Sequence, residues 1–243
     1  MLPVMDILKR IQDQDKATLV RGCTKRVSAL TVHPTTHTFL VASGSKNGEV
    51  GLMALGEDET NPVCVRMEGD DTVIGGLKFA SDKLYSTGSF TGICRVLDPT
   101  AASYDTVVMI DEGVRGLDIR NETDMYLSGN GTGQVSKVDT RTHKVIANYP
   151  DEMDFRRFGS LWTVDCHPFD ANYFVTSSNA GLITVWDDRQ TREPLHLFED
   201  AHSKSVSSAV FDRRTGNTIV TVRVLDLVWC FSGLSLYLCK ISR

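Results

Sequence analysis

Residues 174–189 read FVTSSNAGLITVWDDR, and this stretch decides the fold. It begins with two apolar residues and three small ones, passes through Gly181, and continues as a second apolar run that ends at Trp186 and Asp187. Two short β runs joined by a tight turn, with a glycine that can adopt positive φ, form the pattern of a β-hairpin. The stretch therefore predicts two paired strands that end at Trp-Asp.

The hairpin pattern occurs four times along the chain. The other copies are VASGSKNGEVGLMAL from Val41, YSTGSFTGICRVLD from Tyr85 and YLSGNGTGQVSKVDTR from Tyr126, and the shared turn glycines are Gly48, Gly92, Gly133 and Gly181. Their spacing is close to the period of a WD-type propeller blade, about 40–45 residues. A further β run precedes each hairpin, and a fifth such run follows them, at 26–34, 73–80, 114–120, 161–168 and 205–212. The pattern predicts an all-β protein, a WD40 β-propeller.

The predicted propeller is incomplete, with four full blades and part of a fifth. The fifth repeat is regular up to Thr221, after which the chain reads VRVLDLVWCFSGLSLYLCKISR without an Asp-Gly or Asn-Gly turn. We therefore expect a helical segment and linker at 1–25, propeller blades at 26–222 and a divergent apolar tail at 223–243, as in a C-terminally truncated product. The apolar stretch 224–239 contains Asp226 and is shorter than the roughly 20 residues of a membrane span, so no membrane association is expected.

Composition limits the classes of partner and site. The 243 residues carry a formal net charge of −5, so any nucleic-acid surface has to be a local basic patch. The six cysteines show no C-x-x-C spacing and lie in apolar strands, which favours buried free thiols and no metal site.

The glycine-rich segments do not predict an enzyme. Gly129–Gly133 leads into a strand and not into a helix, so it offers no helix N-terminus for a dinucleotide phosphate. Gly88-Ser-Phe-Thr-Gly92 lacks the spacing of a nucleophile elbow. We expect no catalytic activity and no cofactor.

Several motifs resemble one branch of the WD-repeat proteins. They are Arg26-Val-Ser, His33-Pro-Thr, Gly44-Ser-Lys-Asn-Gly48, Ile74-Gly-Gly-Leu-Lys-Phe79, Gly116-Leu-Asp-Ile119, Val138-Asp-Thr-Arg-Thr142 and Ser207-Ser-Ala-Val-Phe211. Over residues 20–221 this ordered set resembles the smaller subunit of the UV-damaged-DNA-binding complex, DNA damage-binding protein 2. It is similarly close to the sister family, WD-repeat-containing protein 76, and the motifs do not rank the two.

The resemblance implies binding to damaged double-stranded DNA in DNA repair, in the nucleus. Two basic positions of the family match this chain: Arg26, which comes just before a first strand, and Lys46, which lies in a hairpin turn. These loops share one face of a propeller, where both side chains can contact phosphates. Ser160 stands where the fourth blade of the family has a basic residue, and Arg156 and Arg157 are close enough in sequence to compensate.

The resemblance also implies a role as substrate receptor of a cullin-4 ubiquitin ligase. The opening stretch matches fifteen of the sixteen positions of the docking pattern of such receptors, with Ala180 in place of an acid. It implies docking of the large adaptor subunit of the damage-binding complex through Trp186, Asp187 and Arg189, with help from a helix at 5–14. The alternatives are that Trp-Asp-x-Arg only closes a blade, and that the chain is a generic WD-repeat scaffold that binds proteins or histone tails.

Overall fold

The structure, a computed structural model, describes residues 22–34, 39–55, 63–67, 71–98, 103–152, 154–199, 202–223, 228–232 and 235–239. For residues 55, 63–67, 155–156, 223, 228–232 and 235–239 it describes the backbone only. The strands in these residues form five antiparallel sheets of four strands each, which we number blades 1 to 5 in chain order. The helix expected at 5–14 lies outside the described residues.

Each blade is a meander in which neighbouring strands are consecutive along the chain. Blade 1 consists of β1 (Val27–Val32), β2 (Phe39–Ser45), β3 (Val50–Leu55) and β4 (Val63–Met67). Blade 2 consists of β5 (Ile74–Ala80), β6 (Lys83–Gly88), β7 (Ile93–Asp98) and β8 (Ser103–Met109). Blade 3 consists of β9 (Val114–Arg120), β10 (Asp124–Gly129), β11 (Val135–Asp139) and β12 (Lys144–Tyr149).

Blades 4 and 5 follow the same order, after a short helix, α2 (Phe155–Phe158). Blade 4 consists of β13 (Leu161–Cys166), β14 (Tyr173–Ser178), β15 (Ile183–Asp187) and β16 (His196–Phe198). Blade 5 consists of β17 (Val206–Phe211), β18 (Thr218–Arg223), β19 (Val228–Ser232) and β20 (Ser235–Cys239).

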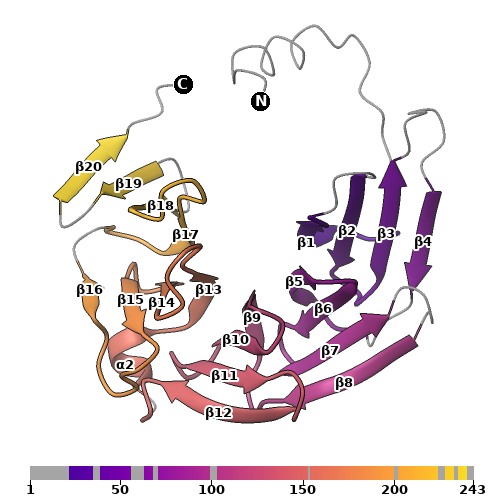
Figure 1. The fold of residues 1–243 in the computed structure, drawn as a ribbon, viewed down its shortest axis with the longest axis horizontal. Coiled ribbons are helices and arrows are strands. Elements are labelled where there is room, and N and C mark those ends of the chain that lie inside the picture. Colours follow the sequence, from indigo (N-terminus) through magenta and orange to yellow (C-terminus); the bar gives the residue numbers. More distant parts are fainter. Residues whose placement is uncertain are drawn as a thin grey trace, which may run out of the picture.

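The five blades follow one another around an open arc, with blade 1 and blade 5 at its two ends (Figure 1). The first strand of each blade lies on the inside of the arc and contacts the first strand of the next blade. The prediction of an all-β propeller is confirmed. The four β runs expected before the hairpins and the fifth run after them also appear, as β1, β5, β9, β13 and β17.

Blade 5 contains more strands than the sequence predicted. The segment expected to be a divergent tail supplies β19, which pairs antiparallel with β18, and β20, which pairs antiparallel with β19. Both strands consist largely of aromatic and other apolar residues, VWCFS and SLYLC, and aromatic residues favour a pleated sheet even without the usual turn residues. The search for an Asp-Gly or Asn-Gly turn therefore missed this hairpin.

Apolar side chains fill the space between consecutive blades. Between blades 3 and 4 the buried cluster contains Tyr126, Tyr149, Phe174 and Trp186. Trp186 is 0% exposed and stacks on Phe174, with the ring centroids 6.2 Å apart. The indole N–H of Trp186 donates a hydrogen bond of 3.1 Å to Thr176 Oγ1. The Trp-Asp signature thus places its tryptophan in the core.

Polar contacts also join the first strands of neighbouring blades. Ser28 Oγ in blade 1 donates a hydrogen bond to Ile74 O in blade 2, at 2.8 Å. Lys78 Nζ in blade 2 lies 2.6 Å from Asp118 Oδ1 in blade 3. Such links along the inner strands connect the blades independently of ring closure.

A carboxylate from the neighbouring β8–β9 connection binds the hairpin turn of blade 3. Thr132 precedes the turn glycine of blade 3, and its backbone N–H donates a 2.7 Å hydrogen bond to Glu112 Oε2 in the β8–β9 connection. Gly131 N–H donates to the same oxygen at 2.8 Å. This turn therefore retains a carboxylate partner, which the local repeat pattern did not reveal.

Candidate nucleic-acid interface

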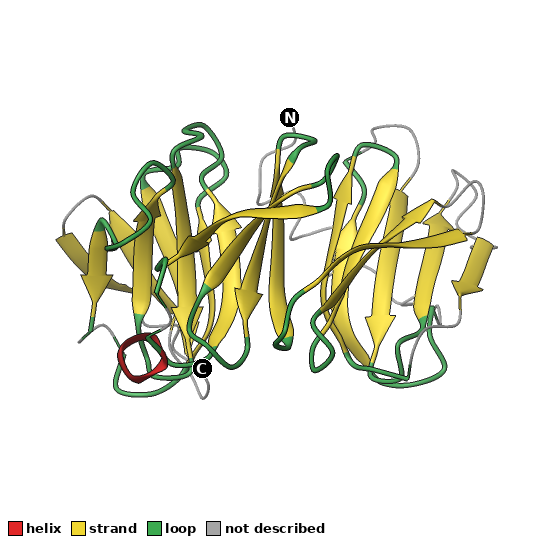
Figure 2. Ribbon diagram, turned by 90° about the horizontal axis from the view of Figure 1, so that it is seen from below, coloured by secondary structure: helices red, strands yellow, loops and turns green. Residues whose placement is uncertain are grey.

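The strands run between two faces that carry the connecting loops (Figure 2). One face carries the hairpin turns of β2–β3, β6–β7, β10–β11 and β14–β15 together with the segments that lead into each first strand, and we call it the turn face. The other ends of these hairpins lie on the opposite face. The antiparallel meander fixes this separation, because the turn between the second and third strands lies at the same end of every blade and the other two connections of the blade lie at the opposite end.

Arg26 and Lys46 lie together on the turn face, as the sequence predicted. Lys46 is in the β2–β3 turn, and its backbone N–H donates a 3.0 Å hydrogen bond to Arg26 O, just before β1. Gly48 completes this turn with φ of 82°, a conformation that favours glycine. Both cationic side chains are exposed, so each can reach an anion outside the protein.

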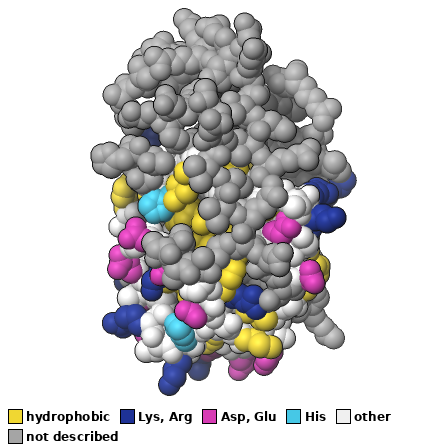
Figure 3. All heavy atoms as spheres, turned by 90° about the vertical axis from the view of Figure 1, so that its right-hand side faces the viewer, with side chains coloured by type: hydrophobic (Ala, Val, Ile, Leu, Met, Phe, Trp, Pro, Cys, Tyr) yellow, Lys and Arg dark blue, Asp and Glu magenta, His cyan; other side chains and the backbone are white. Residues whose placement is uncertain are grey.

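A cavity of about 820 Å³ opens beside these two residues. Its lining comes from all five blades and includes three cationic side chains, Arg26, Lys46 and Arg115. None of the described residues that line it is acidic. The net charge of the whole chain is negative, yet cationic side chains are concentrated at this cavity, as an anion-binding surface requires. On the side of the molecule seen in Figure 3, by contrast, described side chains of both signs are interspersed.

Arg115 and Trp162 form a stacked pair inside this cavity. The guanidinium carbon of Arg115, in β9, lies 4.5 Å from the ring centroid of Trp162, in β13. The Nε atom of Arg115 is buried and has no hydrogen-bond partner among the described residues.

The sequence analysis missed Arg115 and Trp162, although a signal was present. Both occupy the second position of a first strand, a position that is small in the other three blades. An alignment of these strands by position would have found a cation and an aromatic ring side by side in consecutive blades.

The two basic residues proposed for blade 4 are placed differently from Arg26 and Lys46. Arg157 lies at α2 and its Nη1 atom is 2.9 Å from Glu193 Oε2. It does not belong to the lining of the cavity. The backbone of Arg156 is part of α2, but its side chain is outside the described part of the structure. Ser160 O accepts a hydrogen bond from Asn179 N–H, which matches the Arg26–Lys46 arrangement of blade 1.

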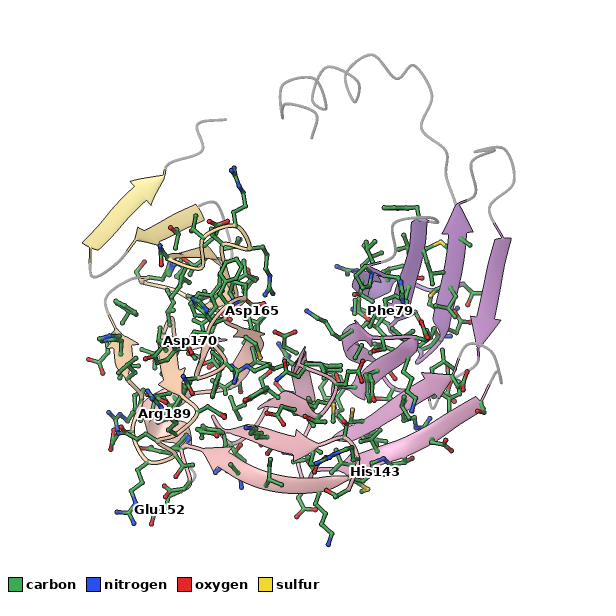
Figure 4. The ribbon with its side chains drawn as sticks, viewed as in Figure 1. Phe79, His143, Glu152, Asp165, Asp170 and Arg189 are labelled. Carbon is green, nitrogen blue, oxygen red and sulfur yellow. The ribbon has the colours of Figure 1, made fainter. Side chains whose placement is uncertain are left out.

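Asp187 and Arg189 lie at the end of the β14–β15 hairpin away from its turn, and therefore on the opposite face. Arg189 Nε and Nη2 donate hydrogen bonds of 2.9 and 2.6 Å to the two Asp187 carboxylate oxygens. These hydrogen bonds lower the pKa of Asp187 below its usual value. The Arg189 side chain is nevertheless 65% exposed, on the outer side of blade 4 (Figure 4). It remains accessible to a partner, whereas the neighbouring signature residue Trp186 is buried in the core.

The same Asp-x-Arg arrangement occurs in blade 3. Arg141 Nε and Nη2 each lie 3.5 Å from the carboxylate oxygens of Asp139, and the Arg141 side chain is 73% exposed. An exposed arginine paired with the aspartate that ends the third strand is therefore a feature of two blades. Its geometry alone does not distinguish a docking residue from the end of a blade.

Asp188, between the two residues of the blade 4 pair, points into the molecule. Its Oδ1 atom accepts hydrogen bonds of 2.9 and 2.7 Å from the hydroxyls of Tyr126 and Tyr149, and its Oδ2 atom lies 2.6 Å from Lys137 Nζ. Burial acts to raise the pKa of Asp188, but the bonds from Lys137 and the two tyrosines bring it below its usual value. This network ties the Trp-Asp-Asp-Arg segment of blade 4 to blade 3.

The described residues hold no group of three or more His, Cys, Asp or Glu side chains that could bind a metal ion. Within the same residues no helix is long and apolar enough to cross a membrane. Three cysteines, Cys23, Cys94 and Cys166, are free and buried, as expected. Burial raises the pKa of the Cys94 and Cys166 thiols, which makes these two poor nucleophiles.

No protein-family model matches the chain. Curated proteins do match it over most of its length. WD repeat-containing protein 76 of Mus musculus is 32% identical over 218 residues, which cover 83% of this chain and 33% of that protein. Protein DAMAGED DNA-BINDING 2 of Arabidopsis thaliana is 24% identical over 236 residues, which cover 90% of this chain and 42% of that protein.

A third relative is DNA damage-binding protein CMR1 of Scheffersomyces stipitis, which is 33% identical over 181 residues, covering 68% of this chain and 34% of that protein. The homologues of the chain are thus WD repeat-containing protein 76 and proteins named for binding damaged DNA. The chain spans between 33% and 42% of the length of these three relatives.

Proposed function

We propose, from its homology to WD repeat-containing protein 76 and the DNA damage-binding proteins, that this chain binds damaged double-stranded DNA through its turn face. Arg26 and Lys46 contact phosphates at the rim of the cavity, and Arg115 adds a third cation within it. Phosphate contacts of this kind supply affinity and fix the position of the protein on the duplex without reading sequence. Arg157 and Arg156 extend the contact toward blade 4.

The observation that carries this proposal is the charge of the cavity, which combines three cations with no acidic side chain among its described lining residues. The same observation disfavours the alternative of a scaffold for histone tails. Such tails are rich in Lys and Arg, and their binding would need carboxylates in this position.

We further propose that the chain acts in the nucleus, in DNA repair, as a substrate receptor of a cullin-4 ubiquitin ligase. In this proposal Asp187 orients Arg189 on the opposite face, and Arg189 binds the large adaptor subunit of the damage-binding complex with its planar set of donors. Because the two faces are separate, DNA and adaptor can bind at the same time. The role is one of binding and not of catalysis.

A mobility-shift comparison tests the DNA-binding proposal. Duplexes with and without a defined lesion are titrated with the wild-type chain and with the double variant Arg26→Glu, Lys46→Glu. The expected result is loss of binding to both duplexes, because the variant places acids beside the phosphates. The control is Arg141→Glu, Arg192→Glu, which changes the net charge equally at exposed residues outside the cavity. Equal loss in both double variants contradicts the proposal.

A further inference from the structure

A groove of about 350 Å³ opens between blades 4 and 5. It lies on the opposite face, because Tyr173 begins β14, Phe211 ends β17 and Gly216 lies in the β17–β18 connection. None of the described residues that line it is acidic. The apolar part of its wall consists of Tyr173, Val185, Phe198, Phe211 and Ile219, with Leu195 at the rim.

The ring of His167 completes this wall, and backbone groups occupy both of its nitrogens. Its Nδ1 atom accepts a 2.8 Å hydrogen bond from Asp170 N–H, and its Nε2 atom lies 3.1 Å from Gly216 O in blade 5. The ring centroid lies 4.8 Å from that of Phe211. His167 is therefore fixed in orientation and presents its ring, and not a free nitrogen, to the groove.

Blade 3 has an ion pair at the positions that form the wall of this groove in blade 4. Tyr173 pairs with the aspartate that ends the third strand of blade 4, and Asp124 pairs with its counterpart in blade 3. Val185 and Lys137 each precede that aspartate by two residues. Lys137 Nζ lies 3.2 Å from Asp124 Oδ2. The same place is thus polar in blade 3 and apolar in blade 4.

The junction between blades 3 and 4 is also filled by a longer side chain. Arg120 stands two residues after Asp118, as His167 stands two residues after Asp165. The Arg120 side chain reaches blade 4, where its Nη2 atom donates a 2.6 Å hydrogen bond to Tyr173 O. The shorter His167 leaves room for the groove at the junction between blades 4 and 5.

Arg189 lies beside this groove. The hydrogen bonds and the charge of Asp187 raise the pKa of the Arg189 guanidinium, and the side chain of Tyr173, in the groove wall, adds to this effect. The Arg189 side chain is 65% exposed, and Leu195 at the rim is 44% exposed. A guanidinium has more N–H donors than one carboxylate accepts, so Arg189 can bind a second acid while Asp187 holds it.

We infer that the groove and Arg189 together dock a segment of the large adaptor subunit in which an apolar side chain stands next to a carboxylate. This inference rests on the proposed adaptor docking. The apolar side chain enters the groove, and the carboxylate accepts hydrogen bonds from Arg189. Anchors buried in pockets contribute much of the free energy of binding at protein interfaces, whereas charged pairs at the rim contribute specificity. The groove thus assigns docking to Arg189 and not to Arg141.

Retention by the immobilised large adaptor subunit tests the apolar part of the site. Leu195→Asp is expected to weaken retention at least about tenfold, the scale of an important interface residue, because it removes the apolar rim and repels the carboxylate. The matched control is Ile146→Asp, which introduces the same charge at a 54% exposed aliphatic residue of β12, in blade 3. It is expected to be retained as wild type is.

Salt separates the apolar contact from the charged one. Leu195→Ala removes only apolar contact, so we expect it to weaken retention by a similar factor at low and at high salt. Arg189→Ala removes a charge, so its effect is expected to be larger at low salt than at high salt. Leu195→Ala also decides the question if Leu195→Asp does not fold, which circular dichroism shows.

The outcomes separate the inference from the proposed function. If Arg189→Ala weakens retention while Leu195→Asp and Leu195→Ala are retained as Ile146→Asp is, the inference is overturned and adaptor docking stands. A Leu195→Ala effect that disappears at high salt also overturns it. Wild type that the adaptor does not retain overturns the proposed docking, and the inference with it.

Discussion

The Oδ2 atom of Asp118 in blade 3 accepts a 2.7 Å hydrogen bond from the backbone N–H of Cys166 in blade 4. Asp165 repeats the arrangement one blade later, where its Oδ2 atom accepts a 2.8 Å bond from Phe211 N–H in blade 5. The two aspartates occupy the same position of their first strands. Each aspartate connects its own blade to the next. Buried carboxylates therefore link blades 3, 4 and 5 along the inner wall of the arc.

Replacing Asp118 tests this connection. Asp118→Ala leaves Cys166 N–H without its acceptor and Lys78 without its partner, so we expect a loss of about 2 kcal/mol in the free energy of unfolding. Urea denaturation followed by circular dichroism measures the loss. The control is Asp105→Ala at an exposed strand position, which is expected to change stability by less than about 0.5 kcal/mol. Similar effects of the two variants contradict the account of the inner wall.

Asp165 predicts a pH dependence of stability. Burial, with the nearby charge of Asp118, raises the pKa of Asp165 to about 6. Because its folded pKa lies above the unfolded value, the stability contributed by protonation is fully present below about pH 4 and is lost as the pH rises through about 6. We expect Asp165→Asn to abolish this part of the dependence, a difference of about 1 kcal/mol between pH 5 and 7.

The measurement for Asp165 is urea unfolding at pH 5 and pH 7 for wild type and Asp165→Asn. Wild type is expected to gain more stability than the variant when the pH is lowered from 7 to 5. The opposite order, or equal changes in both proteins, contradicts the raised pKa.

Docking through Arg189 has a matched control within the chain. Arg189→Ala is expected to weaken retention by the immobilised large adaptor subunit at least about tenfold, the scale of a charged interface contact. Arg141→Ala removes the corresponding exposed arginine of blade 3 and is expected to leave retention unchanged. Retention that is equal in the two variants shows that Asp-x-Arg only ends a blade, and it removes Arg189 from the proposed interface.

Asp188 and Arg189 are neighbours in the chain, but we expect Asp188 to contribute to stability and Arg189 to contribute to docking. Asp188→Ala removes the acceptor shared by Tyr126 and Tyr149 and leaves Lys137 with Asp124 as its remaining partner. We expect a loss of about 3 kcal/mol in the free energy of unfolding. Arg189→Ala, one residue away, is expected to change stability by less than about 0.5 kcal/mol. Thermal unfolding of both variants tests this difference, and a large destabilisation by Arg189→Ala contradicts it.

The sequence predicted the inner three strands of the blades better than the outer strands. Turn glycines such as Gly48 and Gly181, with positive φ of 82° and 90°, mark the hairpins because few other residues adopt that conformation. The outermost strand β12 begins with exposed residues and carries no such signal. The buried inner strands, in contrast, show apolar runs that a single sequence reveals.

The candidate site was only partly predictable for a related reason. Arg26 and Lys46 flank a strand and a turn, so their shared face follows from the meander alone. The pairing of Arg115 with Trp162 is visible in the sequence only when the first strands of neighbouring blades are compared position by position, and not in the pattern of one blade. The role of Asp188 was missed because the pattern reads this residue as a variable position between Asp187 and Arg189.

The salt dependence of duplex binding is the most direct test of the central claim, that Arg26 and Lys46 contact DNA phosphates. The logarithm of the association constant for a short duplex is measured against the logarithm of salt concentration for wild type and for Arg26→Ala, Lys46→Ala. The account predicts a slope that is less steep by about 0.9 for each phosphate that the variant no longer neutralises, with no change in the control variant Arg141→Ala, Arg192→Ala. An unchanged slope in Arg26→Ala, Lys46→Ala would contradict the assignment of the turn face to DNA.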